Sequence, residues 1–185
     1  MHTLARTELL AIWVLWAFPY VFLAPKVQKR PSVTVAAPSH AGVLLQAVGF
    51  LSVWYFRVPE GLRLNPFTVV AALIFGAIAN VLMWTAIPNL GKQFRIQAGL
   101  YEDHQLVRTG PYSIVRHPIY ASIIALMIAT GLLVSQWLWL IVGLVLCVAG
   151  NEIRVRAEEQ LLESRFGDEF REYRKYVPAY IPFVR

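Results

Sequence analysis

Long apolar segments dominate this chain and leave few folds open to it. Residues 67–87 form an unbroken stretch without a charged side chain, and a membrane-spanning helix needs about 20 apolar residues. Shorter apolar segments lie at about residues 9–24, 41–56, 118–134 and 137–150. Hydrophobic residues make up 57% of the chain and charged residues only 15%, which is too apolar for an ordinary soluble domain. The sequence therefore predicts an all-α integral membrane protein with five transmembrane helices.

The chain is short enough to form a single domain over residues 1–185. We expect three spans within residues 1–88. In residues 89–185 we expect a polar connecting stretch, a helical hairpin and C-terminal helices. Only Ser135 and Gln136 separate the fourth and fifth spans, so these two helices should form a tight hairpin.

The fifth helix is predicted to be unusually long. Strong helix formers continue its apolar segment without a break as far as Phe166. A helix of about 30 residues is about 45 Å long, so its polar second half should project beyond the bilayer into the cytoplasm. Gly167 should end this helix. Residues 168–177 should then form a short amphipathic helix with Phe170 and Tyr173 on one side.

Basic residues indicate which side of the chain faces the cytoplasm. The chain has 17 Lys and Arg residues and a net charge of +6. With five spans and a cytoplasmic C-terminus, only Arg6, Arg57 and Arg63 lie on the outer side, and the other fourteen lie on the inner side. Cytoplasmic loops carry an excess of Lys and Arg, so we expect a multi-pass protein whose functional site is on the cytoplasmic face. Because the basic residues adjoin apolar segments, we expect them to meet membrane lipids and not nucleic acid.

Polar residues suited to chemistry are concentrated between the third and fourth spans. Residues 104–120 contain two His, two Arg and two Tyr, together with a Gly-Pro turn and a His-Pro step. Pro118 suits the first turn of a helix, so His117 is either a helix-start residue or a site residue, and His104 is either an exposed loop residue or a site residue. No metal is expected, because neither histidine has the neighbours of a metal site and Cys147 is the only cysteine. The tyrosines and the six Trp are expected mainly as anchors at the membrane interface.

Arg154 and Glu158 share one face of the long helix just beyond the predicted membrane boundary, because they are four residues apart. They could form a simple i,i+4 ion pair. Alternatively, Arg154 could bind a carboxylate through two donors and so orient an acidic, lipid-like substrate. The sequence has no Gly-x-Gly-x-x-Gly, Gly-Lys-Ser/Thr or Gly-x-Ser-x-Gly motif, so Rossmann, P-loop and hydrolase functions have no support.

Several motifs follow one another in a distinctive order in the second half of the chain. In chain order they are Leu106-Val107, Gly110-Pro111-Tyr112, Arg116-His117-Pro118-Ile119-Tyr120, Arg154, Glu158-Glu159, Phe166-Gly167-Asp168-Glu169-Phe170, Tyr173, Val177-Pro178 and Pro182-Phe183. Over residues 89–185 this order resembles the isoprenylcysteine carboxyl methyltransferase family. The combination of Arg-His-Pro-x-Tyr with Glu-Glu is typical of a wider group of membrane methyltransferases that includes phospholipid methyltransferases.

The resemblance implies a methyltransferase that uses S-adenosyl-L-methionine and releases S-adenosyl-L-homocysteine. It implies a cofactor site built from helix ends and connecting loops, and it places Arg154 at the methyl acceptor as the catalytic residue. The cofactor contacts that it implies are Gln97, His104, Gln105, Leu106, Val107, Tyr112, His117, Pro118, Ile119, Tyr120 and Glu158.

Three functions remain open at this point. The leading one is carboxyl O-methylation of an isoprenylcysteine-like acid, with a lipophilic or prenylated substrate and membrane lipids as partners. The alternative is N-methylation of a phospholipid or other small lipid, against which the cationic Arg154 argues modestly. A third is a non-catalytic membrane scaffold that binds no cofactor, and binding of S-adenosylhomocysteine would distinguish it from the other two.

The five-span topology places Ser113 and Ser135 on opposite sides of the membrane. In a chain with Cys147 replaced by alanine, a cysteine at Ser113 should react with a membrane-impermeant maleimide only from the cytoplasmic side. A cysteine at Ser135 should react only from the other side. Labelling of both positions from the same side would rule out the five-span arrangement.

Overall fold

The computed structural model describes residues 2–24, 32–35, 39–57, 65–95, 99–101 and 104–180. These residues form six α-helices, three short helices of other types and two strands. In chain order the elements are α1 (His2–Phe18), the π-helix η1 (Pro19–Leu23), β1 (Ser32–Val35), α2 (Ser39–Tyr55), α3 (Pro66–Leu90), the 3-10 helix η2 (Gly91–Gln93), β2 (Gly99–Tyr101), the 3-10 helix η3 (Gly110–Ser113), α4 (Pro118–Val134), α5 (Trp137–Phe166) and α6 (Asp168–Tyr176).

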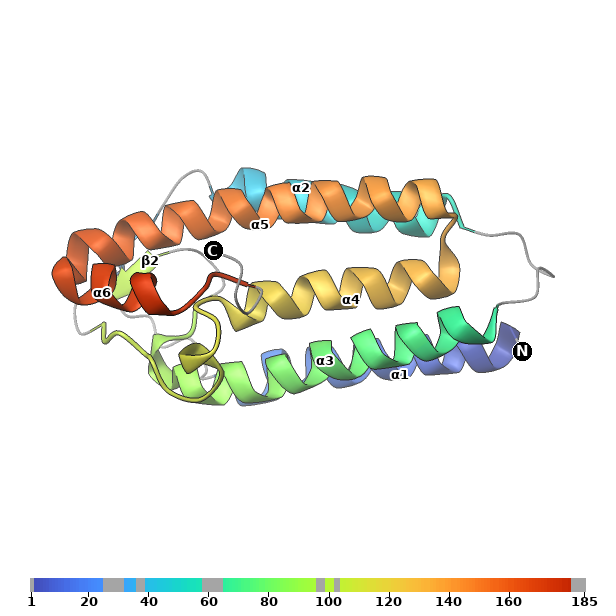
Figure 1. Cartoon of the computed structure of the whole chain (residues 1–185), viewed down its shortest axis with the longest axis horizontal. Helices are drawn as coiled ribbons and strands as arrows, with labels where there is room; N and C mark the ends of the chain where they lie inside the picture. The colour runs from blue at the N-terminus through green and yellow to red at the C-terminus, as the bar shows by residue number, and fades with distance from the viewer. Residues whose placement is uncertain are drawn as a thin grey trace.

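The helix α4 lies at the centre of an elongated bundle. It is flanked by α2 and α5 on one side and by α1 and α3 on the other (Figure 1). More than half of the residues of α4 are buried. At one end of the bundle lie α6 and β2, and the N-terminus lies at the opposite end (Figure 1). The bundle therefore surrounds α4 with four helices and gathers the loops and short elements at one end.

Local sequence signals explain the helix boundaries. The Asn65 side chain accepts a hydrogen bond from the Phe67 backbone nitrogen at 3.0 Å, and Pro66 occupies the first turn, so α3 begins there. Gly167 has a φ of 53° and ends α5, because glycine adopts this left-handed backbone conformation without a steric penalty. The connection between α4 and α5 consists of Ser135–Gln136 alone, as expected for the hairpin.

Helix lengths agree with the sequence-based expectation in α5 and differ from it in the first helix. α5 is one continuous helix of 30 residues, as expected from its strong helix formers. The first helix begins at His2, earlier than its apolar segment, and Pro19 marks the change from α1 to the π-helix η1. A proline removes a backbone donor, and such insertions of π-helix are one way in which a helix adapts.

A short antiparallel sheet adds to the bundle, which is otherwise all-α as predicted. Strand β1 pairs with β2, with Ser32 opposite Tyr101 and Val35 opposite Gly99. The Ser-Val-Thr-Val sequence of β1 contains the β-branched residues that favour strands. Its partner lies far along the chain, so the pairing could not be recognised from either segment alone.

The helices α2 and α5 pack at backbone contact. A Cβ atom on Gly42 would lie 2.5 Å from the Gly150 carbonyl oxygen, and one on Gly49 would lie 2.7 Å from the Gly143 carbonyl oxygen. Small residues allow this close approach, which matters in apolar surroundings because packing holds membrane helices together there. The position of α2 relative to α5 is therefore set along most of its length.

Two indole groups of α1 bind hydroxyl groups of α4. Trp13 Nε1 donates to Thr130 Oγ1 at 3.1 Å, and Trp16 Nε1 donates to Ser122 Oγ at 3.2 Å. Both hydroxyl residues are buried, where a polar group needs a partner. These two tryptophans therefore attach α1 to α4, whereas the sequence had suggested interfacial anchors.

The outer surface of the bundle is apolar. Large apolar side chains are exposed along α1, η1, α2, α3 and α5, among them Leu10, Phe22, Leu44, Leu51, Phe67, Ile74, Ile141 and Val145. Two helical segments, Pro66–Gln93 and Trp137–Phe166, are long and apolar enough to cross a membrane by length and composition. Thr7–Leu23 and Pro118–Val134 are apolar but shorter. These features suit a membrane protein, and the five-span topology stays a prediction.

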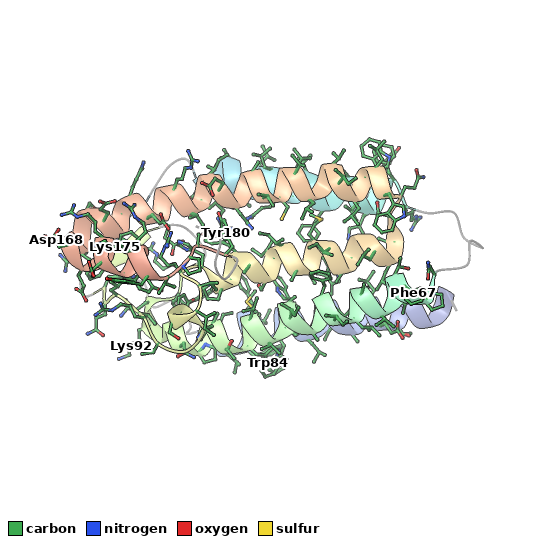
Figure 2. All side chains as sticks on the ribbon, in the orientation of Figure 1. Phe67, Trp84, Lys92, Asp168, Lys175 and Tyr180 are labelled. Carbon is green, nitrogen blue, oxygen red and sulfur yellow. The ribbon has the colours of Figure 1, made fainter. Side chains whose placement is uncertain are left out.

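Charged side chains gather at one end of the bundle. Figure 2 shows Lys92, Asp168 and Lys175 at this end and Phe67 at the other. Trp84 lies between them on the outer side of the bundle and stacks on Phe18 at a ring-centroid distance of 5.3 Å. The polar groups are thus separated in space from the apolar length of the helices.

Replacement of Gly49 by leucine should destabilise the bundle, because there is no space for the new side chain between α2 and α5. Overpacking costs about 1–3 kcal/mol, so the detergent-solubilised variant should unfold at a lower temperature than the wild type. Ala47→Leu is the matched control, because residue 47 lies on the exposed side of the same helix. Equal unfolding temperatures for the two variants would contradict the close contact.

Candidate functional site

A cavity of about 400 Å³ lies where α3, α4 and α5 meet the loop at residues 104–109 and α6. Its lining contains every expected site residue within the described part of the chain. These are His104, Gln105, Leu106, Val107, Tyr112, His117, Pro118, Ile119, Tyr120, Arg154 and Glu158. Gln97 lies outside the described residues. Folding therefore brings the central polar stretch and the polar half of α5 to one cavity.

The cavity is lined by both polar and apolar side chains. The polar residues include His104 and Gln105 of the loop at residues 104–109, His117 at the start of α4, and Arg154 and Glu158 of α5. The apolar groups come from α1, α3 and α4, and they include Trp16, Met83 and Ile123. A cavity with both kinds of lining can contact polar and apolar parts of its ligands.

The turn η3 places Tyr112 at the cavity. Gly110 has a φ of 58°, and a Cβ atom there would lie 2.5 Å from the Asn89 side-chain oxygen. Glycine therefore allows the loop to rest against the end of α3, and Pro111 starts the turn. The Tyr112 side chain is buried, and its backbone oxygen accepts a hydrogen bond from the Tyr173 hydroxyl.

Burial keeps these two tyrosines neutral. Burial raises the pKa of Tyr112 well above its usual value, and the negative charge of Glu158 raises that pKa further. Burial likewise raises the pKa of Tyr173 to about 12. Both hydroxyls therefore serve the cavity as neutral hydrogen-bonding groups and not as bases at neutral pH.

Arg116 and Glu159 form a buried ion pair beside the cavity. The Nε and Nη2 atoms of Arg116 donate to Glu159 Oε1 at 2.9 and 2.7 Å, and both residues are only 5% exposed. His117 Nε2 lies 3.2 Å from the same oxygen. A buried charge requires such partners, because an uncompensated one is costly. The pair joins the segment before α4 to the polar half of α5.

The same arginine also holds the segment that follows α6. Its Nη1 atom donates to the Val177 carbonyl oxygen and, at 3.1 Å, to the Arg174 carbonyl oxygen. The backbone nitrogens of residues 116–117 donate to the carbonyl oxygens of residues 178–179 at 2.8 and 2.9 Å. These bonds keep α6 against the cavity, which Phe170 of α6 lines.

Arg154 and Glu158 have partners on other helices. The Tyr120 hydroxyl donates to Glu158 Oε2 at 3.1 Å, and His117 Nδ1 lies 3.9 Å from that oxygen. Arg154 Nη1 donates to Gln46 Oε1 at 3.1 Å, and the guanidinium carbon lies 4.9 Å from the centre of the Tyr120 ring. These contacts to other helices differ from the i,i+4 ion pair that was one of the alternatives left by the sequence.

Sequence reasoning assigned no role to Gln46 or Glu159. Gln46 Nε2 donates to Asn151 Oδ1, and Asn151 Nδ2 donates to the Tyr120 carbonyl oxygen at 3.1 Å. Gln46 is a polar residue within an apolar segment, and this is the signal by which it could have been found. Glu159 directly follows Glu158, and only the fold shows that the two carboxylates have different partners.

The cavity offers a ligand a carboxylate, a guanidinium, imidazoles, phenols and apolar surface. Among the described residues, no group of three or more His, Cys, Asp and Glu side chains is placed to hold a metal ion. Cys147 is buried, and it packs with Val53 and Met127. The arrangement suits binding and alignment of an organic donor and acceptor.

A family model matches the chain over residues 70–164, which is just over half of its length. The model describes the isoprenylcysteine carboxyl methyltransferase (ICMT) family. The matched region extends from α3 to the polar half of α5 and contains most of the cavity lining.

Individual relatives agree with this match. A protein-S-isoprenylcysteine O-methyltransferase of Schizosaccharomyces pombe is 33% identical over 117 residues, which are 62% of this chain and 49% of the relative. Protein-S-isoprenylcysteine O-methyltransferase B of Arabidopsis thaliana is 31% identical over 109 residues, which are 58% of this chain and 55% of the relative. A protein-S-isoprenylcysteine O-methyltransferase of Saccharomyces cerevisiae is 38% identical over 82 residues, which are 44% of this chain and 34% of the relative. The chain thus spans about half or less of the length of these curated relatives.

Glu159→Ala should destabilise the protein strongly, because it leaves the buried Arg116 guanidinium without its carboxylate. Breaking a buried pair costs about 3–5 kcal/mol, which chemical denaturation of the detergent-solubilised protein would measure as a lower free energy of unfolding. Asp168→Ala removes a carboxylate from an exposed pair with Arg171 and should change the free energy of unfolding little. Similar losses in both variants would show that the buried pair does not have the structural role described here.

Proposed function

The chain belongs to the isoprenylcysteine carboxyl methyltransferase family, and on that premise we propose that it methylates the carboxylate of a lipophilic, isoprenylcysteine-like acid with S-adenosylmethionine as methyl donor. The names of its curated relatives, protein-S-isoprenylcysteine O-methyltransferases, support this activity. One observation carries the proposal. Arg154 and Glu158 line a single cavity together with apolar side chains, so a polar donor and an acidic lipid can meet there.

The lining residues fit a nucleoside that carries a charged amino-acid end. Glu158 can accept hydrogen bonds from polar hydrogens and favours a nearby positive charge, and aromatic side chains such as Tyr112 can contact an adenosine. Gln93 Oε1 is buried, and it has no hydrogen-bond partner within the described part of the chain. Gln93 lines the cavity, so this oxygen can accept from an amino group of the ligand. When bound there, S-adenosylmethionine would supply a methyl group attached to a positively charged sulfur.

Methyl transfer to a carboxylate depends on alignment more than on acid or base catalysis. A carboxyl group has an unperturbed pKa of about 4, so the acceptor is already ionised at neutral pH. In the proposed reaction, one acceptor oxygen would form a bond to the methyl carbon as the bond between that carbon and sulfur breaks. The protein must hold the reactants in line and exclude water, to which buried lining residues such as Tyr112, His117 and Phe170 contribute.

Arg154 orients the acceptor carboxylate in this proposal. Its guanidinium is held by Gln46 Oε1 and by the Tyr120 ring, and a planar guanidinium can donate to both oxygens of a carboxylate. A very tight grip would make the oxygen a poorer nucleophile. We therefore assign to Arg154 the positioning of the acceptor carboxylate and not an increase in the nucleophilicity of that carboxylate.

The apolar side chains of the lining accommodate the lipid part of the acceptor in this proposal. Trp16, Met83 and Ile123 provide surface for a hydrocarbon chain. Val43 also lines the cavity and is 46% exposed on the outer surface of α2. We therefore propose that a membrane-bound acid enters from the side of Val43, where a bilayer would cover the helix.

The charged end of the bundle supports a site on the cytoplasmic face. Lys92 and Lys175, which are among the basic residues that favour the cytoplasm, lie at this end (Figure 2). Five spans with this orientation would bring a soluble methyl donor and a membrane-bound acid to the same cavity.

An amine acceptor, such as that of a phospholipid, suits the cavity less well. An amine favours an acidic or aromatic surface. Here the guanidinium of Arg154 covers the Tyr120 ring, and Glu158 accepts a hydrogen bond from the hydroxyl of that tyrosine. A scaffold without cofactor would show no affinity for S-adenosylhomocysteine, so calorimetry on the purified protein tests that alternative.

Substitutions of Arg154 and Glu158 should have different effects. Arg154→Lys should leave S-adenosylhomocysteine affinity nearly unchanged but lower methyl transfer to an N-acyl-S-prenylcysteine about tenfold or more, because an ammonium group lacks the planar pair of donors. Glu158→Gln should weaken S-adenosylhomocysteine binding about tenfold, because it loses a charge-assisted hydrogen bond. Calorimetry measures the binding, and transfer of a labelled methyl group measures the turnover.

The control for this pair is Glu152→Gln. Glu152 lies on the same helix, its carboxylate accepts hydrogen bonds from Arg156 and Tyr180, and it is not part of the cavity lining. This substitution should change neither binding nor turnover appreciably. Wild-type turnover in both Arg154→Lys and Arg154→Ala would defeat the orienting role and would favour an uncharged acceptor. Equal and small effects of the Arg154 and Glu158 substitutions on binding and turnover would indicate that these two residues only form an ion pair with each other.

A further inference from the structure

We propose that Gln46 on α2 is a positioning residue that sets the direction in which Arg154 faces the methyl acceptor. This inference rests on the acceptor role of Arg154 in the proposed function. Gln46 lies outside residues 70–164, so the family match does not assign it a role. The argument comes from its hydrogen bonds, its burial and the packing of α2.

The side-chain amide of Gln46 connects two residues of α5. Gln46 is only 7% exposed, its Oε1 accepts from Arg154 Nη1 at 3.1 Å, and its Nε2 donates to Asn151 Oδ1. Asn151 is fully buried, and its Nδ2 donates to the Tyr120 carbonyl oxygen at 3.1 Å. Each amide thus donates through nitrogen and accepts through oxygen, so the chain of bonds has one consistent direction. Reversal of the Gln46 amide would place its nitrogen against the donor of Arg154.

Arg154 is held between α2 and Tyr120. A Cβ atom on Gly42 would lie 2.5 Å from Arg154 Cγ, so the backbone of α2 lies directly against the stem of this side chain. The Tyr120 ring contacts the guanidinium on another side at 4.9 Å. Because Asn151 binds the backbone of that same tyrosine, α2, α4 and α5 jointly determine where the guanidinium lies.

The side-chain amide of Gln46 carries no charge, and this matters for the binding of an acidic ligand. Arg116, which joins the loop to α5 and α6, is bound by the carboxylate of Glu159. Arg154 receives a neutral acceptor from α2. A neutral acceptor can fix the direction of a guanidinium without adding a negative charge that would repel an acidic ligand. Gln46 is therefore suited to a cation that must bind an anion.

The position of Gln46 on a rigid helix favours this role. α2 packs closely against α5 through glycine contacts that include Gly42 and Gly150. Gly42 lies one turn from Gln46, and Gly150 directly precedes Asn151. Groups on packed helices are placed more accurately than groups on loops. The ordering of Arg154 therefore occurs on folding and does not have to accompany acceptor binding.

The test compares an acid with its neutral analogue in the full-length, detergent-purified protein. The variants are Gln46→Met, which removes both amide bonds at similar side-chain length, and Gln46→Glu, which adds a negative charge beside Arg154. The ligands are an N-acyl-S-prenylcysteine as methyl acceptor and its primary carboxamide as a competitive inhibitor. Ser52→Ala is the matched control. Ser52 lies on the same helix, and in the described part of the structure its hydroxyl donates only to the Gly49 carbonyl oxygen.

We expect Gln46→Met to raise KM for the acid about tenfold, as for the loss of one hydrogen bond to a charged group, and to reduce the preference for acid over carboxamide toward equality. Gln46→Glu should reduce this preference further and favour the carboxamide. S-adenosylhomocysteine affinity should stay within about twofold of the wild type in both, since the amide bonds do not involve Glu158. Ser52→Ala should behave as the wild type.

Two results would overturn the inference while the proposed function stands. One is an unchanged preference for the acid in both Gln46 variants of an active enzyme. The other is a parallel loss of S-adenosylhomocysteine binding and turnover with no change in preference, which would show that Gln46 only supports the packing of the helices. A wild-type protein that binds S-adenosylhomocysteine but does not methylate the acid would overturn the proposed function, and this inference with it.

Discussion

The buried contact between Arg116 and Glu159 determines how the second half of the chain is assembled. Burial of two charges is expensive, and a buried ion pair adds little net stability compared with apolar residues of the same size. Its effect is on arrangement, because few placements of the loop and α5 give both charges a partner. The same guanidinium binds the Arg174 and Val177 carbonyl oxygens. This one side chain therefore contributes two of the hydrogen bonds that hold α6 at the cavity.

A second constraint acts at the opposite side of the cavity. Gly42 and Gly49 bring α2 to backbone contact with α5, and this contact places Gln46 within reach of Asn151 and Arg154. Amide and guanidinium groups in an apolar environment need partners, and here they provide them for one another. The two networks come together at the start of α4, where His117 approaches Glu159 and Tyr120 approaches Glu158.

These two networks assign different tasks to similar residues. The carboxylate of Glu159 is nearly inaccessible and neutralises a cation that holds the fold together. The side chain of Glu158 is 34% exposed, and it lines the cavity. Adjacent residues on a helix point about 100° apart, so one Glu-Glu step can serve both a structural pair and a ligand site. The proposed methyl transfer requires both a rigid frame and accessible polar groups in a cavity that also has apolar lining residues.

Much of the fold and part of the site could be read from the sequence, because those features are local. The apolar segments predicted the helices, and Pro118, the Ser135–Gln136 connection and Gly167 mark boundaries that the structure also shows. The candidate residues between His104 and Tyr120 are close in the chain, and the motifs that they form pointed to the family. The outer faces of the helices are apolar as the composition required.

Tertiary structure alone decided which distant residues meet. Arg116 and its partner Glu159 are 43 positions apart in the chain, and Gln46 and its partner Arg154 are 108 positions apart. The β1–β2 pairing and the bonds from Trp13 and Trp16 to α4 are of the same kind. Helical periodicity says which residues share a face, but the rotation and close approach of two helices depend on packing over their whole length. For that reason the sequence alone determined the helices and the main candidate residues, and the fold determined the orientation of Arg154.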